Sequence, residues 1–449
     1  MKDMARSIVR PALVAAAASL LAACASGDSF ELPKLASLNP FAKAEEKLPG
    51  KRIAVLTETD QLAGRMETAS APVALPEAIT NSDWSAAGGT PANAPGHLAF
   101  GGGLKTSWSS SAGTGSSSRG KLTASPIVHQ GRVYVLDAVG AVSAFNASGG
   151  GRAWTTSLAP EHENAGEGQG GGITAEGDRI FAGTGFGTAV AIDASSGAKL
   201  WEKKLGAPVR TSPTVADGRV YVVNTEGQVY CLSGADGSIL WRYLGVPQQA
   251  AGLLNNSSPA VQGGTVVVPF SSGDVVALNV ETGQPVWTDS LSQARSGSSL
   301  ASLSDPASPV IDGGVVFAVS HSGRLIATDE KTGERLWSLN VSSAKQPAVA
   351  GDALYVADTT GRLIAVTRAT GEVRWATKLP GDSRIWNGPV LAGGRLWLTS
   401  GAGKIVGVDA ATGKVGLDRD LGEAMYISPI IAGGRMYVLT DKASLVALN

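Results

Sequence analysis

Few side chains in this 449-residue sequence have the type and spacing that catalysis or metal binding requires. The two cysteines, Cys24 and Cys231, are far apart in the sequence and form neither an adjacent pair nor a cluster. No two of the four histidines have the spacing of a zinc site; they are His97, His129, His162 and His321. Cys231 lies in the apolar stretch "VYCLS", where we expect a small core residue. The sequence therefore predicts no catalytic residue, no metal site and no cofactor.

Two glycine-rich stretches resemble binding loops. "EHENAGEGQGGG", at residues 161–172, gathers acidic side chains around His162 between two expected strands. It could form a metal or ligand loop, although a solvated surface loop is favoured. "GTGFGT", at residues 183–188, mimics a phosphate-binding loop. A phosphate loop leads into a helix, whereas this stretch joins two expected strands, so a hairpin turn is favoured.

Composition favours many short strands joined by tight turns. The chain has 58 glycines and 10 tryptophans, and 17% of its residues are charged. Valine-rich runs bounded by glycine are typical of an all-β protein. The formal net charge of −1 gives no indication of a basic surface for nucleic acid.

The N-terminal residues have the order of features found in a secretion signal. Three basic residues precede the apolar run "PALVAAAASLLAA", which is too short to span a bilayer comfortably. The run ends in "LAAC", which resembles the bacterial lipobox and implies that Cys24 is lipidated. An ordinary cleavage site beside a stray cysteine is the alternative. Ala25 stands where an aspartate would signal retention at the inner membrane, so we expect a lipid anchor at the periplasmic face of the outer membrane.

The rest of the chain divides into a tether and a repeat region. Residues 1–23 are predicted to be a signal peptide, and residues 24–80, rich in Pro, Ala and mixed charges, a flexible periplasmic tether. Residues 81–449 carry an internal repeat with a period of about 44 residues, which is typical of a propeller blade. A polar turn, a glycine and a tryptophan recur at fixed offsets in it, as in "DASSGAKLW" and "DEKTGERLW". Aligned copies end at Trp154, Trp201, Trp241, Trp287, Trp337, Trp375 and Leu417.

The two ends of the repeat region complement each other. The final copy stops at Asn449, before its turn and tryptophan strand, while an isolated tryptophan strand, "GLKTSWSSS" with Trp108, precedes the first full copy. Pairing the two closes a ring and leaves no unpaired sheet edge at the ends. We therefore predict an eight-bladed β-propeller of four-stranded antiparallel blades, closed by an N-terminal strand that pairs with the C-terminal blade.

The lipobox, the tether and the closed repeat together resemble the BamB family of outer-membrane β-barrel assembly lipoproteins. The stretches "HENAGEGQGGG" and "ASPVIDGGVVFAVSHSGRLIA" resemble its α-proteobacterial branch. The resemblance implies a non-catalytic scaffold of the β-barrel assembly (BAM) complex. It also implies binding to the POTRA domains of BamA and to other BAM components, and assistance to unfolded outer-membrane protein precursors.

Two neighbouring inter-blade connections carry the family's partner contacts. The first reads "GLLNNSSPAV", with Leu253 at the family's leucine and Leu254 where an arginine is expected, followed by Asn255 and Asn256. The second reads "LASLSDPASPV", with Ser304 and then Asp305 at one of the family's aspartates. These residues are the predicted partner-binding site. Two ordinary loops with their leucines tucked under a blade are the alternative.

Two other function classes remain open at this stage. The repeat also resembles that of quinone-dependent dehydrogenases (PQQ enzymes), which typically carry a vicinal disulfide, a calcium site and a catalytic aspartate, with the cofactor at the ring axis. A carbohydrate- or cell-wall-binding propeller would instead need exposed aromatic residues on one face. Most tryptophans fall at the repeat position, with Trp386 and Trp397 as the main exceptions.

Overall fold

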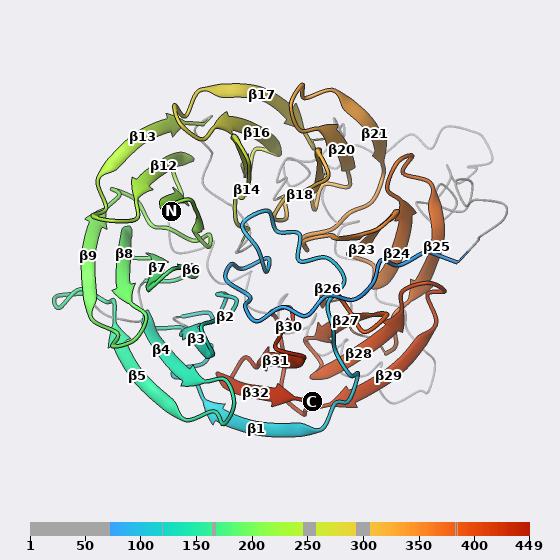
Figure 1. The fold of residues 1–449 in the computed structure, drawn as a ribbon, viewed down its shortest axis with the longest axis horizontal. Coiled ribbons are helices and arrows are strands. Elements are labelled where there is room, and N and C mark those ends of the chain that lie inside the picture. The colour runs from blue at the N-terminus through green and yellow to red at the C-terminus, as the bar shows by residue number, and fades with distance from the viewer. Residues whose placement is uncertain are drawn as a thin grey trace, which may run out of the picture. The chain divides into compact units, whose positions relative to one another are not determined.

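The described part of the protein is built entirely from strands and turns. The computed structural model describes residues 72–118, 120–163, 168–245, 257–292, 306–381, 383 and 385–449. Within these ranges the strands form eight four-stranded antiparallel sheets around a common axis (Figure 1). The predicted eight-bladed β-propeller is therefore confirmed. No helix in the described ranges is long and apolar enough to cross a membrane.

The first four blades follow one another along the chain, each built from the axis outward. Blade 1 contains β2 (Ile127–His129), β3 (Arg132–Leu136), β4 (Ala141–Asn146) and β5 (Arg152–Ser157). Blade 2 contains β6 (Gly171–Glu176), β7 (Arg179–Thr184), β8 (Thr188–Asp193) and β9 (Lys199–Lys204). Blade 3 contains β10 (Thr214–Ala216), β11 (Arg219–Val223), β12 (Gln228–Ser233) and β13 (Ile239–Leu244). Blade 4 contains β14 (Ala260–Gln262), β15 (Thr265–Pro269), β16 (Asp274–Asn279) and β17 (Pro285–Ser290).

The next three blades repeat this order, and the eighth is composite. Blade 5 contains β18 (Val310–Asp312), β19 (Val315–Val319), β20 (Leu325–Asp329) and β21 (Arg335–Leu339). Blade 6 contains β22 (Ala348–Ala350), β23 (Ala353–Ala357), β24 (Arg362–Thr367) and β25 (Val373–Lys378). Blade 7 contains β26 (Trp386–Ala392), β27 (Arg395–Ser400), β28 (Lys404–Asp409) and β29 (Val415–Asp420). Blade 8 contains β30 (Ile430–Ala432), β31 (Arg435–Leu439), β32 (Ser444–Leu448) and β1 (Thr106–Ser111).

Blade 8 closes the ring as the sequence predicts. Strand β1 pairs antiparallel with β32, placing Trp108 opposite Ala447. Figure 1 shows β1 on the outer rim beside β32, between the outer strands of blades 7 and 1. The pairing satisfies the backbone groups of β32 that would otherwise form an open edge.

The core lies between blades, because both faces of each middle strand are covered. In β11, all residues after Arg219 are buried, whereas the outer strand β9 alternates between exposed and partly buried residues. Apolar side chains on both faces of a strand require packing on both sides, and adjacent blades provide it. Hydrophobic clusters accordingly join residues of neighbouring blades, as Phe181 of blade 2 and Val220 of blade 3 do.

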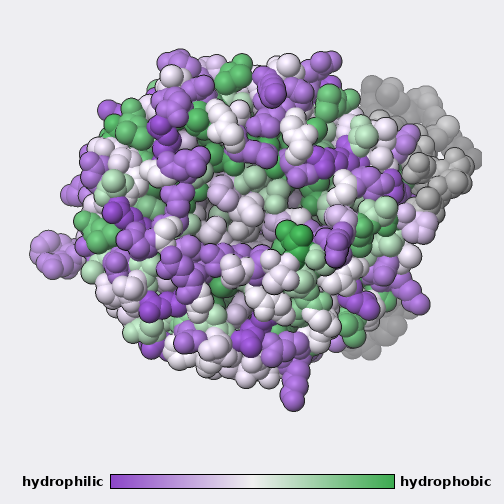
Figure 2. All heavy atoms as spheres, viewed as in Figure 1, coloured by the Kyte–Doolittle hydropathy of each residue, from purple (hydrophilic) through white to green (hydrophobic). Residues whose placement is uncertain are grey.

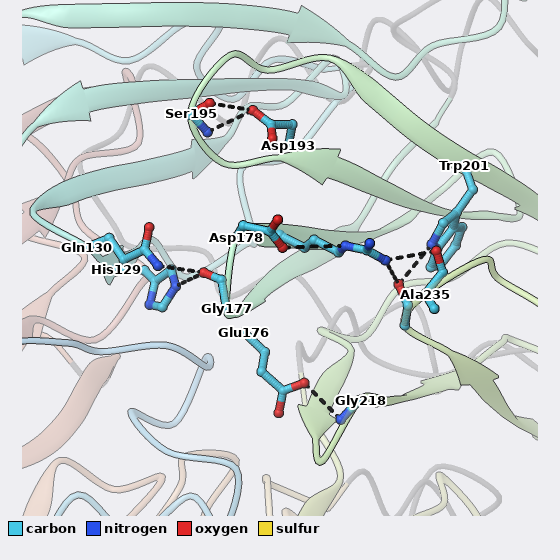
Figure 3. A network of polar contacts seen from close by, with 12 residues as sticks. His129, Gln130, Glu176, Gly177, Asp178, Asp193, Ser195, Trp201, Gly218 and Ala235 are labelled. Carbon is cyan, nitrogen blue, oxygen red and sulfur yellow. Dashed lines mark hydrogen bonds and ion pairs between the residues drawn. The ribbon is translucent and has the colours of Figure 1, made fainter.

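The repeated tryptophan and glycine lock each blade to the next. Trp201, at the end of blade 2, donates its indole Nε1–H to the carbonyl of Gly234 in blade 3 at 3.1 Å. Figure 3 shows Trp201 beside the blade 3 turn that contains Ala235. Gly237 in that turn has φ of +72°, and a Cβ there would lie 2.7 Å from the ring of Trp201. Turn glycines stack in this way on the preceding blade's tryptophan at Gly150, Gly197, Gly237, Gly283, Gly333, Gly371 and Gly413.

The missing tryptophan of the seventh copy has a structural reason. Leu417 of β29 stands at the repeat's tryptophan position and is 41% exposed. The ring would have packed on the turn between the third and fourth strands of blade 8. Those strands, β32 and β1, come from distant parts of the sequence, so no glycine turn joins them. A tryptophan at position 417 would have no turn to stack on.

Candidate functional site

Residues 79–100, here called the axial plug, cross the centre of the ring. Figure 1 shows this segment in blue across the middle of the propeller. It pairs with the innermost strands: Trp84 and Val128 exchange two backbone hydrogen bonds, of 2.7 and 2.9 Å. Further backbone bonds reach other blades from Ala175 N–H to Ser85 O, Val261 N–H to Pro91 O, Ile311 N–H to Ala92 O and Leu98 N–H to Leu391 O. Segments far apart in sequence therefore meet at the axis, and the plug joins blades on all sides of it.

Buried polar side chains hold the plug in place. Asn93 is fully buried; its Nδ2 donates to Pro309 O at 2.9 Å, and its Oδ1 accepts from Ser258 Oγ at 3.3 Å. The ring of His129 lies 2.9 Å from the Asp83 carboxylate through Nδ1. Its Nε2–H donates to Gly177 O at 2.7 Å, and Figure 3 shows His129 and Gln130 converging on that carbonyl. Thus His129 serves structure, joining the plug to blades 1 and 2.

His97 anchors the other end of the plug to blade 7. Its Nδ1–H donates to Pro76 O at 2.7 Å, and its Nε2 accepts from the Gly394 backbone N–H at 2.9 Å. The two contacts together fix a neutral tautomer, because one ring nitrogen must donate while the other accepts. Figure 2, in the same view as Figure 1, shows residues of mild hydropathy at the ring centre and more hydrophilic ones around the rim.

The first strands of the blades begin on one face of the ring, here called the connection face. The strands of a blade alternate in direction, so each fourth strand ends at the face where the next blade's first strand begins. The connections into blades 4 and 5 end side by side, because Ser258 N–H donates to Ser308 Oγ at 2.9 Å. Leu253, Leu254, Asn255, Asn256, Ser304 and Asp305 lie just before these points but outside the described residues. The structure thus brings together the ends of both predicted loops, and their partner role stays a prediction.

A cavity of about 310 Å³, here called the axial well, lies at the ring centre where the first strands begin. Ala87 of the plug contributes to its wall, and the other lining residues come from the connections into blades 1, 5, 6, 7 and 8. Most of the polar lining is uncharged: Thr123, Ser125, Ser308, Gln346, Asn387 and Ser428. Ile385 and Tyr426, which also line it, remain 52% and 44% exposed.

Among the described residues that line the well, Lys345 is the one with a charged side chain. Burial lowers the pKa of its amine to about 8, because protein atoms replace most of the water around the ammonium. Within the described ranges, no carboxylate forms an ion pair with Lys345. The described lining of the well therefore holds a partly buried cation with no anionic partner among the described residues.

The remaining sequence candidates have structural roles. Cys231 is buried opposite Trp241, at a position that most other blades fill with alanine, and burial raises the pKa of its thiol to about 11. The stretch at residues 183–188 is the predicted hairpin, joining β7 to β8 with Gly187 at φ of +75°. The loop at residues 161–172 is described only in part, and His162 is exposed. No group of three metal-ligating side chains suited to an ion occurs in the described ranges.

The two exceptional tryptophans are core residues. Trp397 is fully buried, with its ring edge-on to Phe100 of the plug at 5.3 Å, and Trp386 is 3% exposed. Of the large hydrophobic side chains exposed in the described ranges, Tyr426 is the one aromatic. A carbohydrate-binding face built from several exposed aromatics is therefore not favoured.

The axis also fits poorly with a quinone cofactor. On one side the plug occupies it, and Cys231 is the one cysteine in the described ranges, so no vicinal disulfide can cover a cofactor there. None of the described residues in the wall of the axial well carries a carboxylate that could bind calcium. Two of the features that distinguish those enzymes, the vicinal disulfide and the calcium-binding carboxylate, are therefore not found among the described residues at the axis.

Sequence reasoning missed both the plug and the well. The plug stretch "NSDWSAAGGTPANAPGHLAF" has no strand period, so it gives no sign of its path. The well had a detectable signal: most copies begin their first strand with Ser-Pro, as at Ser125, Ser308 and Ser428, whereas blade 6 reads Lys345-Gln346-Pro347. The fold of the ring does not require Lys345 at this position, because other blades carry a different residue there. Such a departure from the repeat is therefore a signal for a role other than folding.

Comparison with known proteins identifies the family. The family profile described as outer membrane protein assembly factor BamB matches residues 138–377 and 379–449, more than half of the chain. The chain belongs to the BamB family. The resemblance seen in the sequence is confirmed, while the α-proteobacterial branch stays a prediction. The BamB protein of Yersinia pestis is 29% identical over 177 residues, which cover 38% of this chain and 45% of that protein. The chain spans about half the length of the curated relatives it matches.

Solved structures show the same fold with different functions. The crystal structure of BamB from Moraxella catarrhalis aligns with a TM-score of 0.64 at 22% identity, covering 77% of this chain and 99% of that one. A quinohemoprotein alcohol dehydrogenase from Comamonas testosteroni aligns with a TM-score of 0.65 at 14% identity, covering 82% and 81%. Because a scaffold family and an enzyme share the propeller almost equally, the fold does not distinguish them, and the BamB family assignment rests on sequence.

Proposed function

We propose that this protein is a non-catalytic scaffold of the outer-membrane β-barrel assembly machinery. The observation that carries the proposal is the BamB family match over the propeller. The axis supports it, because the chain's own plug occupies one side of the ring axis, on which a quinone enzyme would place its cofactor. Cys24, outside the described residues, would carry the lipid anchor at the periplasmic face of the outer membrane.

The connection face near blades 4 and 5 is the proposed docking site for the POTRA domains of BamA. The hydrogen bond between Ser258 and Ser308 supports one shared patch, because it holds the ends of the two predicted loops together. In that patch Leu253 and Leu254 would supply buried apolar area, and Asp305 would set the register against a basic group. Unfolded barrel precursors would be guided by the assembled complex.

Co-purification tests the docking site. The double variant Leu253→Asp with Asp305→Lys should lose BamA from detergent-solubilised outer membranes, because it removes apolar area and reverses the local charge. Leu200→Asp with Glu202→Lys on β9 makes the same chemical changes on the exposed rim of blade 2 and should keep BamA. Retention of BamA by the first variant, with its fold intact by circular dichroism, would move the interface elsewhere on the ring.

Two further measurements test the anchor and the absence of catalysis. Cys24→Ser should release the protein into the soluble periplasmic fraction or leave it unprocessed, since acyl chains provide the membrane affinity. Continued outer-membrane fractionation of this variant without BamA would refute the anchor. Bound quinone in the purified protein, together with dye-linked alcohol oxidation, would replace the scaffold proposal with an enzyme.

A further inference from the structure

The axial well combines three features that suit a small ligand. It has room for about ten water molecules at their liquid volume. Its wall presents hydroxyl donors, among them Ser125 and Ser428. Lys345, the one charged residue in its described lining, has no anionic partner in the described ranges, and Ile385 and Tyr426 in the same lining are about half exposed.

The positive charge of Lys345 favours a ligand that carries one negative charge. Removing an ammonium from water is unfavourable unless an anion accompanies it, and Lys345 is partly buried in the wall of the well. One cation balances one negative charge, so a carboxylate is matched whereas a phosphate dianion would leave a charge unpaired. The second carboxylate oxygen can accept hydrogen bonds from the serine hydroxyls.

The apolar side chains that line the well favour a ligand that also carries a hydrophobic group. Ile385 belongs to the connection into blade 7, and Tyr426 to the connection into blade 8. A ligand with its carboxylate on Lys345 and a hydrophobic group on this pair would cover side chains that are about half exposed. A fully polar anion would leave them in water.

We propose that the axial well binds a small amphipathic carboxylate, with the anion on Lys345 Nζ and the apolar group against Ile385 and Tyr426. The shared chemistry has two sources, a free organic acid or the C-terminus of a peptide. Ser308, at the end of the connection into blade 5, lines the well, whereas its other described lining residues belong to the plug or lie near the starts of blades 1, 6, 7 and 8. The ligand is titrated in the absence of BamA, so this proposal can fail without affecting the proposed docking.

Calorimetric titration with 3-phenylpropionate tests the site. Binding should be saturable, and Lys345→Gln should weaken it at least tenfold, because the substitution removes the charge and keeps a hydrogen-bonding group. Lys204→Gln, on the exposed outer strand β9, is the matched control and should bind like the wild type. The amide 3-phenylpropionamide should not bind, and Tyr426→Ala should weaken the acid several-fold.

The dependence of affinity on pH gives a second readout. Lys345 and Tyr426 are the titratable residues among the described lining of the well, and the ammonium form of Lys345 is required. Affinity should therefore decline as the pH rises above about 8, and this decline should be absent in Lys345→Gln. Bound ligand should raise the pKa of Lys345 and so lower the fraction of neutral amine. Acylation of Lys345 by a small amount of an amine-reactive reagent should therefore be slower when the ligand is bound.

A peptide arm distinguishes the two sources. A five-residue peptide ending in phenylalanine is compared with its C-terminally amidated form. Tighter binding of the free-acid peptide than of 3-phenylpropionate would assign the site to a chain terminus, and binding of the small acid alone would assign it to a free organic acid. Failure of both, or equal binding by Lys345→Gln, would overturn the proposal.

Discussion

Replacing Gly237 with alanine tests whether the tryptophan–glycine stack couples blades. The new Cβ would lie 2.7 Å from Cε3 of Trp201, whereas carbon atoms prefer about 3.5 Å, so the ring must retreat by about 0.8 Å. Such a retreat would lengthen the 3.1 Å bond from Trp201 Nε1 to Gly234 O beyond hydrogen-bonding distance. The stack and the bond would therefore fail together.

The expected loss in the free energy of unfolding of Gly237→Ala has a conformational part and a packing part. Any L-residue at φ of +72° costs about 1–2 kcal/mol relative to glycine. Overpacking adds about 1–3 kcal/mol, and loss of the hydrogen bond adds about 0.5–1.5 kcal/mol. Gly218 in the same blade has φ of +71°, and a Cβ there would meet no atom within 4 Å, so Gly218→Ala should show the conformational part alone. We expect Gly237→Ala to be less stable than Gly218→Ala by about 2–3 kcal/mol.

Urea denaturation followed by far-ultraviolet circular dichroism measures the difference. The same pair of substitutions is made in a Trp201→Ala background, where the ring is gone and the penalty of Gly237→Ala should fall to that of Gly218→Ala. If the two substitutions are equally destabilising with Trp201 present, the stack does not couple the blades and this account of the repeat is wrong.

Three further predictions concern ring closure, the plug and the axial well. Deleting residues 106–111 should lower the thermal midpoint sharply and cause concentration-dependent aggregation, because the edge of β32 becomes exposed; an unchanged midpoint would contradict the closure. Asn93→Ala should cost about 1–3 kcal/mol and speed amide exchange in residues 79–100, since its buried partners Ser258 and Pro309 lose their bonds; unchanged exchange would show that backbone pairing alone holds the plug. Lys345→Met should stabilise the ligand-free protein at pH 7 by roughly 1–3 kcal/mol. The folded-state pKa of about 8 lies below the ordinary 10.5, so the lysine's penalty is full below pH 8 and fades towards pH 10.5; a gain independent of pH would mean that added apolar contact is the cause.

The repeat made most of the architecture predictable from the sequence. The glycine–tryptophan spacing identified the outer strand and turn of each blade, because only glycine fits beneath the ring at positive φ. The incomplete final copy and the surplus strand at Trp108 predicted the composite blade 8. Cys231 was predicted to be a core residue, and its place opposite Trp241 explains why a small side chain is needed there.

Only the tertiary structure decided what occupies the axis. The plug residues obey no periodicity, and their partners, such as Ser258 for Asn93, lie more than a hundred residues away along the chain. Likewise, Lys345 could be seen to depart from the repeat, yet its burial and the side chains facing it depend on five blades meeting at one point. The sequence repeat reveals contacts that recur at a fixed spacing along the chain. The contacts at the axis each occur once and form only when the whole ring closes, so no repeated pattern predicts them.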